Sequence, residues 1–442
     1  MSALKKSVRK HEVDVVTLGC SKNLIDSERL LGRLAKAGIK AYHNPDKIGS
    51  ESVVVNTCGF IGDAKEESIE MILDLVGAKE RGEIGKIAVM GCLSERYRKE
   101  LEEEIPEVDR WFGKFDWPGV VKWLNPSSDD TIVKPWDRVV TTLPHNAYLK
   151  ISEGCNRRCA FCAIPLITGS HKSRPFEEIE DEVRSLVDIG VREFNVIAQD
   201  LSSYGLDLYH TQKLPELIER LANINGVDWL RLHYAYPSQF PMEIMDVMAR
   251  NKNVCNYLDI ALQHISDNVL GSMRRHITSS QTRELLAEMR NKVPGLHLRT
   301  TLMVGFPGEG EKEFLELMDF AKEQKFERMG AFAYCEEDDT YAARMLKDSV
   351  PPEEKQRRLD ALMELQEEIS LEIQNQKVGQ KLRVMIDREE NDHYVGRTEW
   401  DSPEVDPEVL VKKGEKELRP GEFYEVVIDE AMPFELIGHA AD

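Results

Sequence analysis

The sequence lacks the features that place a protein in or across a membrane. No run approaches the roughly 18 apolar residues that a membrane-spanning helix needs. The N-terminal segment MSALKKSVRK leads into polar sequence and not into the apolar core of a signal peptide. We therefore expect a cytoplasmic protein with no membrane partner. Thiols stay reduced in the cytoplasm, so the eight cysteines of the chain are more suited to metal binding than to disulfides.

Positive charge and histidine are also in short supply. The chain has 58 Lys and Arg against 79 Asp and Glu, which gives a formal net charge of −21. This acidic balance argues against a broad nucleic-acid footprint and is compatible with basic partners. None of the 11 histidines has the H-x3-H spacing of a metal site. The chain does have 442 residues, of which 41 % are hydrophobic, enough for about three domains with cores of their own.

The first predicted domain, residues 11–126, alternates strand and helix signals. Three short apolar runs, rich in β-branched residues and typical of buried parallel strands, end at Cys20, Cys58 and Cys92. Segments with helical spacing separate these runs. The pattern predicts a doubly wound α/β domain. All three cysteines then lie at the carboxyl ends of strands, the edge where open parallel sheets bind ligands.

A second predicted domain, residues 141–372, follows a linker at residues 125–130. It contains six strand candidates, at Ala147–Ile151, Glu193–Ala198, Trp229–His233, Tyr257–Leu262, Leu298–Met303 and Met329–Tyr334. Helical stretches between them predict a parallel sheet curved into a partial or full (β/α) barrel. A long charged helix then leads to a third predicted domain, residues 375–442, whose short strands favour a small β-barrel of the oligonucleotide-binding shape.

Three cysteines lie close together directly after the first strand of the second domain. Cys155, Cys159 and Cys162 have C-x3-C-x2-C spacing. Three thiolates at this spacing suit one face of a [4Fe–4S] cube and leave the fourth iron open for a small ligand. A zinc site and inert buried thiols are the alternatives, although zinc usually takes four protein ligands in paired C-x2-C spacing. The spacing favours the cluster.

This loop resembles that of the radical S-adenosylmethionine (SAM) enzymes, in which it is the most specific mark. The resemblance implies that the open iron binds SAM, and that an electron from the cluster cleaves it to a 5′-deoxyadenosyl radical. Gly305 and Glu309, after the fifth strand, resemble the family's glycine-containing SAM-contact segment. Such a turn also occurs in ordinary strand-to-helix connections.

Four further residues of the second domain have two interpretations each. Gln199 and Asp200, at the end of its second strand, are candidates for contact with SAM or substrate, although an Asp there also caps the next helix. Arg275 belongs to a basic loop that either clamps a carboxylate or, more commonly, faces solvent. Tyr236 either lines the site or packs in the core.

The order of the three domains is similar to that of the methylthiotransferases, which end in a TRAM-like β-barrel. Cys20, Cys58 and Cys92 are each ordinary core fillers when taken alone, but three at matching strand ends are not. The resemblance implies that they hold a second [4Fe–4S] cluster. That cluster carries a sulfur that is methylated from one SAM and delivered to a carbon radical generated by a second SAM. An electron donor, such as flavodoxin or ferredoxin, and a sulfur donor are implied as well.

The motif at the first cysteine separates two branches of that family. Cys20-Ser21-Lys22-Asn23 differs from the Cys-Gln-Met-Asn of the MiaB-type branch, which modifies N6-isopentenyladenosine in tRNA. It resembles the branch that methylthiolates the β-carbon of an aspartate in small-subunit ribosomal protein twelve. Residues 377–442 hold 9 basic and 17 acidic side chains, so we do not expect nucleic-acid binding by the third domain. An acidic barrel suits a basic ribosomal protein, with a partnerless acidic surface and the tRNA enzyme as alternatives.

Overall fold

The computed structural model describes residues 8–128, 134 and 137–441. The chain divides into two compact units. One holds the residues up to Thr141 together with Ala163–Ser170, and the other holds Thr142–Cys162 and the residues from His171 onward. None of the described helices is long and apolar enough to cross a membrane. Of the predicted linker, residues 129 and 130 lie outside the described residues.

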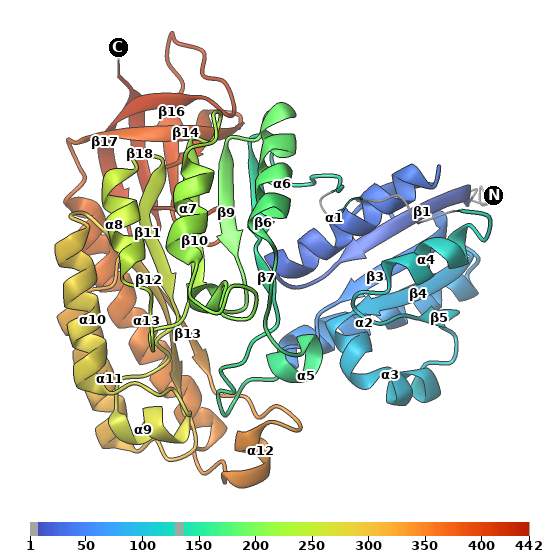
Figure 1. Ribbon diagram of the computed structural model, residues 1–442, viewed down its shortest axis with the longest axis horizontal. Helices are drawn as coiled ribbons and strands as arrows, with labels where there is room; N and C mark the ends of the chain where they lie inside the picture. The colour runs from blue at the N-terminus through green and yellow to red at the C-terminus, as the bar shows by residue number, and fades with distance from the viewer. Residues whose placement is uncertain (1–7, 129–133, 135–136, 442) are drawn as a thin grey trace, which may run out of the picture. The chain divides into compact units, whose positions relative to one another are not determined.

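The first unit contains a five-stranded parallel sheet with the order β2-β1-β3-β4-β5 (Figure 1). Its strands are β1 (Arg9–Thr17), β2 (Lys40–His43), β3 (Ser50–Thr57), β4 (Lys86–Gly91) and β5 (Arg110–Trp111). The strand order reverses between β1 and β3. This reversal is the topological switch point at which doubly wound sheets bind ligands, so the loops after β1 and β3 flank a natural site.

Helices cover both faces of this sheet. They are α1 (Ser21–Lys36) and α4 (Trp117–Leu124) on one face, and α2 (Gly62–Glu80) and α3 (Cys92–Glu104) on the other. Strand β3 shows the alternation that makes this possible, because Val54 packs with the first pair whereas Val53 and Val55 pack with the second. The predicted doubly wound fold is confirmed. The short helix α5 (Ile164–Thr168) also belongs to this unit.

The second unit contains a six-stranded parallel sheet with the order β13-β12-β11-β10-β9-β6. The strands are β6 (Asn146–Lys150), β9 (Glu193–Ile197), β10 (Trp229–Ala235), β11 (Val254–Ile260), β12 (His297–Val304) and β13 (Arg328–Ala333). All six strand candidates are therefore present. The sheet does not close on itself, because β6 and β13 form its two edges. The predicted barrel is partial.

Shorter elements connect these strands. The helices between strands are α6 (Phe176–Asp188), α7 (Leu214–Ala222), α8 (Glu243–Arg250), α9 (Asp267–Ser272), α10 (Ser279–Lys292) and α11 (Glu311–Gln324). The small pair β7 (Ser152–Glu153) and β8 (Lys172–Ser173), the 3₁₀ helix η2 (Leu201–Ser203) and α12 (Tyr341–Met345) lie in the loops. The helices between consecutive strands produce the parallel order of the sheet.

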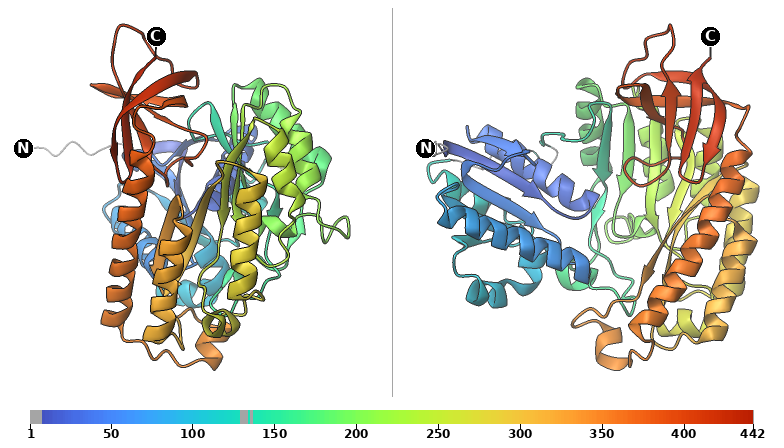
Figure 2. Two further views of the ribbon diagram at one scale, coloured as in Figure 1. Left: turned by 90° about the vertical axis from the view of Figure 1, so that its left-hand side faces the viewer. Right: turned by 180° about the vertical axis from the view of Figure 1, so that it is seen from behind.

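A closed five-stranded barrel ends the chain, as predicted. Its order is β14-β15-β16-β18-β17, with β14 (Lys381–Glu389), β15 (His393–Arg397), β16 (Glu408–Lys412), β17 (Phe423–Met432) and β18 (Glu435–Ala440). Figure 2 shows the long helix α13 (Pro352–Asn375) leading from the sheet up to this barrel. Side chains such as Val384, Val409 and Val426 alternate inward and fill the barrel interior.

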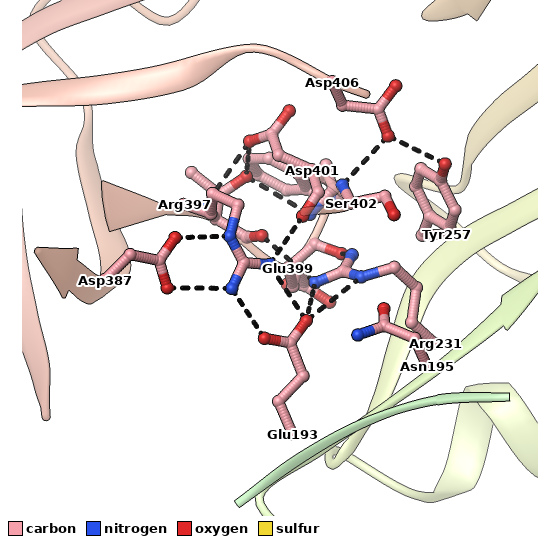
Figure 3. A network of polar contacts seen from close by, with 12 residues as sticks. Glu193, Asn195, Arg231, Tyr257, Asp387, Arg397, Glu399, Asp401, Ser402 and Asp406 are labelled. Carbon is pink, nitrogen blue, oxygen red and sulfur yellow. Dashed lines mark hydrogen bonds and ion pairs between the residues drawn. The ribbon is translucent and has the colours of Figure 1, made fainter. Parts of the chain in front are cut away.

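A buried ion network fixes the barrel to the amino-terminal ends of the six-stranded sheet (Figure 3). Arg397 of β15 binds Asp387 of β14 at 2.5 Å and Glu193, the first residue of β9, at 2.7 Å. Arg231 of β10 binds the same Glu193 at 3.0 Å. Because all four side chains are buried, each charge needs its partners. The barrel is thus joined to the amino-terminal ends of the strands, opposite the carboxyl ends.

Candidate metal centres

Cys20, Cys58 and Cys92 lie at one edge of the five-stranded sheet. Cys20 is in the loop after β1, Cys58 directly follows β3, and Cys92 directly follows β4. Parallel strands end at a shared edge, so these three loops meet there. Cys58 is buried, and burial together with the charges of the other two cysteines raises the pKa of its thiol to about 11. Metal binding at Cys58 would therefore have to displace a firmly held proton.

The three loops approach so closely that two positions require glycine. Gly19 has φ +86°, and a Cβ there would lie 2.8 Å from the sulfur of Cys58. Gly91 has φ +104°, and a Cβ there would lie 2.5 Å from the side-chain oxygen of Asn56. No L side chain combines this backbone conformation with such crowding at low cost. The glycines before Cys20 and Cys92 are thus what allows the cysteine loops to converge.

A buried lysine that the sequence interpretation missed lies beside this trio. Lys114 Nζ is 3.6 Å from Cys92 Sγ, 2.8 Å from a carboxylate oxygen of Asp26 and 3.1 Å from the side-chain oxygen of Asn23. Lys114 follows the fifth strand at the same sheet edge. That strand has only 2 residues, too few for a periodic pattern. Had it been recognised, a polar residue after it would have been the signal.

The second trio comes from a single loop after β6 and β7. The backbone N–H of Cys162 donates to the carbonyl of Cys159 at 3.1 Å, and the N–H of Arg157 donates to the sulfur of Cys155 at 3.5 Å. Burial raises the pKa of the Cys155 thiol to about 12. Local bonds of this kind fold the loop back on itself, so the three cysteines lie in one short stretch of turned backbone.

Distant segments hold this loop in place. Ala160 donates its N–H to the carbonyl of Met273 at 2.9 Å and accepts from the N–H of Ala342 at 2.7 Å. Arg157 binds the carboxylate of Asp200 at 2.6 Å. Asp200 also accepts from the N–H of Ser202 at the start of η2, so the helix-cap interpretation of Asp200 is confirmed.

Arg275 reaches into the same site. Its guanidinium lies 3.1 Å from Cys159 Sγ and 4.1 Å from the centre of the Tyr236 ring, over which the guanidinium of Arg157 also lies, at 4.3 Å. The Tyr236 hydroxyl is 3.8 Å from the same sulfur. The expectation that the basic loop faces solvent is wrong for Arg275, which is 3 % exposed. Its charge is drawn inward by the thiol, by the ring and by the carbonyl of Ala261.

Gln199 follows β9 and bonds to the segment that leads into the cysteine loop. Its amide nitrogen donates to Glu153 in β7, just before Cys155. Its amide oxygen is buried and has no hydrogen-bond partner among the described residues, and the same holds for one guanidinium nitrogen each of Arg157 and Arg275. Buried polar atoms without partners are costly, and their grouping indicates room for a polar ligand next to this trio.

The other two predicted SAM contacts are engaged within the chain. Gly305 has φ +73°, and a Cβ there would lie 2.4 Å from Lys355 of α13, so packing alone explains the glycine. Glu309 is buried, accepts from the N–H of Gly305 at 2.9 Å and pairs with Arg358 at 2.8 Å. A SAM contact by either residue stays a prediction. The bonds shown assign Glu309 to shaping the Gly305 turn.

Each trio offers three thiol groups, the soft donors that iron–sulfur clusters take. Across residues 8–128, 134 and 137–441, no three His, Cys, Asp or Glu side chains are grouped as one metal ion would need. Zinc would hold its thiolates about 2.3 Å from one centre. A cube of four irons keeps its thiolates further apart, and soft sulfur donors suit it. That the six cysteines are cluster ligands stays a prediction.

Three family models match the chain. They are the radical SAM superfamily at residues 149–321, the uncharacterized protein family UPF0004 at residues 12–113 and the TRAM domain at residues 378–440. Each matches one of the three segments that differ in strand pattern. The central match begins within β6, contains β9 to β12 and ends before β13, and the terminal match contains all five strands of the closed barrel.

Curated relatives match over nearly the full length. The ribosomal protein uS12 methylthiotransferase RimO of Parabacteroides distasonis is 58 % identical over 431 residues, which cover 98 % of this chain and 99 % of the relative. The protein of the same name from Flavobacterium johnsoniae is 49 % identical over 437 residues, covering 99 % of each chain.

Solved structures are similar in fold. The radical SAM methyltransferase TsrM from Kitasatospora setae, with cobalamin and a [4Fe-4S] cluster bound, has a TM-score of 0.56 at 15 % identity, covering 73 % of this chain and 75 % of TsrM. The cobalamin-dependent SAM radical enzyme OxsB has a TM-score of 0.52 at 13 % identity, covering 82 % of this chain and 56 % of OxsB. At these identities the likeness concerns the fold alone.

Proposed function

Because the chain belongs to the ribosomal protein uS12 methylthiotransferase family named RimO, we propose that it methylthiolates an aspartate of ribosomal protein uS12 at the β-carbon. The product would be a 3-methylthioaspartate residue. The observation that carries this proposal is the 58 % identity to a relative of that name over 98 % of the chain. Several further relatives have the same name, which favours this reading over the tRNA enzyme.

We assign the two cysteine trios to two [4Fe–4S] clusters with different tasks. Cys155, Cys159 and Cys162 hold the cluster that binds and cleaves SAM. Cys20, Cys58 and Cys92 hold the cluster that donates sulfur. When bound, the clusters would supply an electron and a sulfur atom, and SAM would supply the carbon-centred radical and the methyl group. Radical chemistry is needed because the β-C–H bond of aspartate offers no acidic proton to a base at neutral pH.

In our proposal the chain's own residues orient these groups. The Arg157–Asp200 ion pair and the backbone bonds of Ala160 hold the central loop in one conformation. In our proposal the unpartnered amide oxygen of Gln199 accepts from the ammonium group of SAM. Gly305 offers its turn to SAM, with Glu309 positioning that turn through its bond to the Gly305 N–H.

The domain division follows from these roles. We propose residues 11–126 as the methylthiotransferase domain, 141–372 as the radical SAM core and 375–442 as the TRAM-like barrel. The core and the barrel belong to one compact unit. The barrel therefore forms a fixed surface beside the core and can serve as a docking arm for substrate.

The acidic barrel supports a basic protein partner. Its 9 basic and 17 acidic residues between 377 and 442 repel phosphate groups and attract a basic ribosomal protein. We propose that nucleic acid is not a ligand of this barrel. A flavodoxin or ferredoxin would supply electrons, and a separate donor would supply sulfur. An enzyme with a ribosomal substrate would act in the cytoplasm.

One incubation tests this function. The reconstituted enzyme, with SAM and a reductant, is offered either ribosomal subunits lacking the modification or undermodified tRNA, and both are analysed by mass spectrometry. The proposal expects one methylthio group on an aspartate of uS12 and none on tRNA. A methylthio group on an adenosine of the tRNA, with uS12 unchanged, would overturn the proposal.

A further inference from the structure

The buried lysine beside the first cysteine trio has more contacts than an ordinary ion pair needs. The side chains of Lys114 and Asp26 are 2 % and 0 % exposed, and their charged atoms are 2.8 Å apart. The same ammonium donates to Cys92 Sγ at 3.6 Å and to Asn23 at 3.1 Å. Asn23 in turn accepts from the thiol of Cys92 at 3.4 Å. One cation thus connects a carboxylate, an amide and a cysteine.

Stability alone does not account for this arrangement. Removing two charges from water costs about as much as their attraction returns, so a buried pair is weak evidence for a stabilising role. An apolar pair of similar size would fill the same space. The position of Lys114 at the carboxyl edge of the sheet, next to Cys92, points to a need for positive charge at that place.

The cysteine trio provides such a need. Three thiolates around one cluster leave the site with net negative charge, which increases when the cluster accepts an electron. Asp26 anchors the Lys114 ammonium through a buried ion pair of 2.8 Å.

We propose that Lys114, anchored by Asp26, is the built-in counter-ion of the N-terminal cluster and raises its reduction potential. This inference rests on the proposed function, because it takes Cys20, Cys58 and Cys92 as the ligands of that cluster. Positive charge and hydrogen bonds to cluster sulfurs favour the reduced state, as protein surroundings do in other iron–sulfur sites. Lys114 is a positioning residue, since it acts through Cys92 and the cluster.

The test uses the full-length chain with Cys155, Cys159 and Cys162 replaced by Ala, so that only the N-terminal site can be filled. In this parent, the midpoint potential is measured by a redox titration followed by electron paramagnetic resonance. Removing the cation in K114M is expected to give the most negative potential, and removing both charges in K114M/D26N an intermediate one. K114R, which keeps the charge, is expected to stay close to the parent, and D26N to lie above it.

Controls separate charge from folding. Lys79 is another lysine of the same unit, and its partner Asp109 lies at the amino-terminal ends of the strands, away from the cysteines. The variant Lys79→Met should leave the midpoint potential unchanged. If K114M does not fold, D26N and K114R still decide the order.

Two failures are distinguishable in this experiment. Equal potentials in the parent, K114R, D26N and every folded Lys114 variant would overturn the counter-ion role. A folded parent that takes up no iron would instead overturn the proposed function of the N-terminal cysteines.

Discussion

The two cysteine sites are built in opposite ways. The N-terminal site draws one cysteine from each of three strand ends, so its geometry is a property of the whole sheet. The central site draws all three from one loop, which needs clamps from distant segments at Met273 and Ala342. Both place a buried cation on one sulfur, Lys114 on Cys92 and Arg275 on Cys159.

This difference teaches how each site depends on its surroundings. A site assembled from three strand ends is lost when the strands no longer align, even if every cysteine is intact. A site within one loop survives changes elsewhere in its sheet as long as its clamps remain. The two sites are therefore expected to fail separately, under different substitutions.

The largest expected effect is the loss of SAM cleavage in Cys159→Ala. Removing one member of a catalytic set commonly lowers the rate by about a thousandfold or more, so 5′-deoxyadenosine formation should fall at least that far. Product is measured by chromatography after reduction in the presence of SAM. The exposed Cys335 serves as the control, and Cys335→Ala should keep full activity. A full rate in the Cys159 variant would show that the central loop does not hold the SAM-cleaving cluster.

Cys58→Ala is expected to separate the two sites by product. Methylthio transfer to uS12 should fall about a thousandfold, since the sulfur-donating site loses a ligand. Formation of 5′-deoxyadenosine should continue, because the central loop is unchanged. Both products are measured in one reaction. An equal loss of both would show that the sites do not function independently.

Arg397→Met should destabilise the second unit without changing the first. The substitution leaves Glu193 and Asp387 buried without their shared partner, which costs about 3–5 kcal/mol. Hydrogen exchange should rise in β6, β9 and the closed barrel and stay constant in β1, β3 and β4. Arg388→Met is the matched control, because its pair with Glu408 is partly exposed and contributes about 1 kcal/mol or less. Similar exchange in both variants would contradict the role of the network.

Gly91→Ala is the counterpart in the first unit. The added Cβ at φ +104° would lie within 2.5 Å of Asn56, so we expect a loss of about 3 kcal/mol and weaker iron binding at the N-terminal site. Gly38 also has positive φ, +71°, but nothing lies within 4 Å, so Gly38→Ala should cost only about 1 kcal/mol. Hydrogen exchange of β3 and β4 compares the two. Equal effects would show that the close approach of the loops is unimportant.

The smallest expected effect is the loss of stability of the second unit as the pH falls. Burial alone would raise the pKa of Asp387, but Arg397 and His145 together outweigh burial and lower that pKa to about 2. An unfolded Asp has a pKa near 3.9, so this carboxylate contributes about 2.6 kcal/mol of stability that is fully present above roughly pH 4. The contribution is lost as the pH falls through about 2. Asp387→Asn should show a shallower decline of stability between about pH 4 and 2, and an unchanged slope would contradict this.

Much of the fold follows from the sequence because its signals are local. All six strands of the central sheet were predictable, since each is a short apolar run between helical stretches. The cysteines at strand ends and the C-x3-C-x2-C loop were predictable for the same reason. The closed barrel followed from alternating strands separated by glycine and proline.

The cations of the two sites were not predictable, because their positions depend on long-range packing. Arg275 lies 116 residues from Cys159 in sequence, and a basic loop normally faces solvent. Lys114 follows a strand too short to give a pattern. The ion pair between Glu309 and Arg358 was not predictable either, because it forms only where α13 packs against the turn at Gly305.

Iron and sulfide analysis after anaerobic reconstitution tests the two-cluster assignment most directly. The full chain should bind about eight irons, and each of two variants that lack one whole trio should bind about four. A value of about four for the full chain, or a variant whose remaining trio binds no iron, would contradict the assignment.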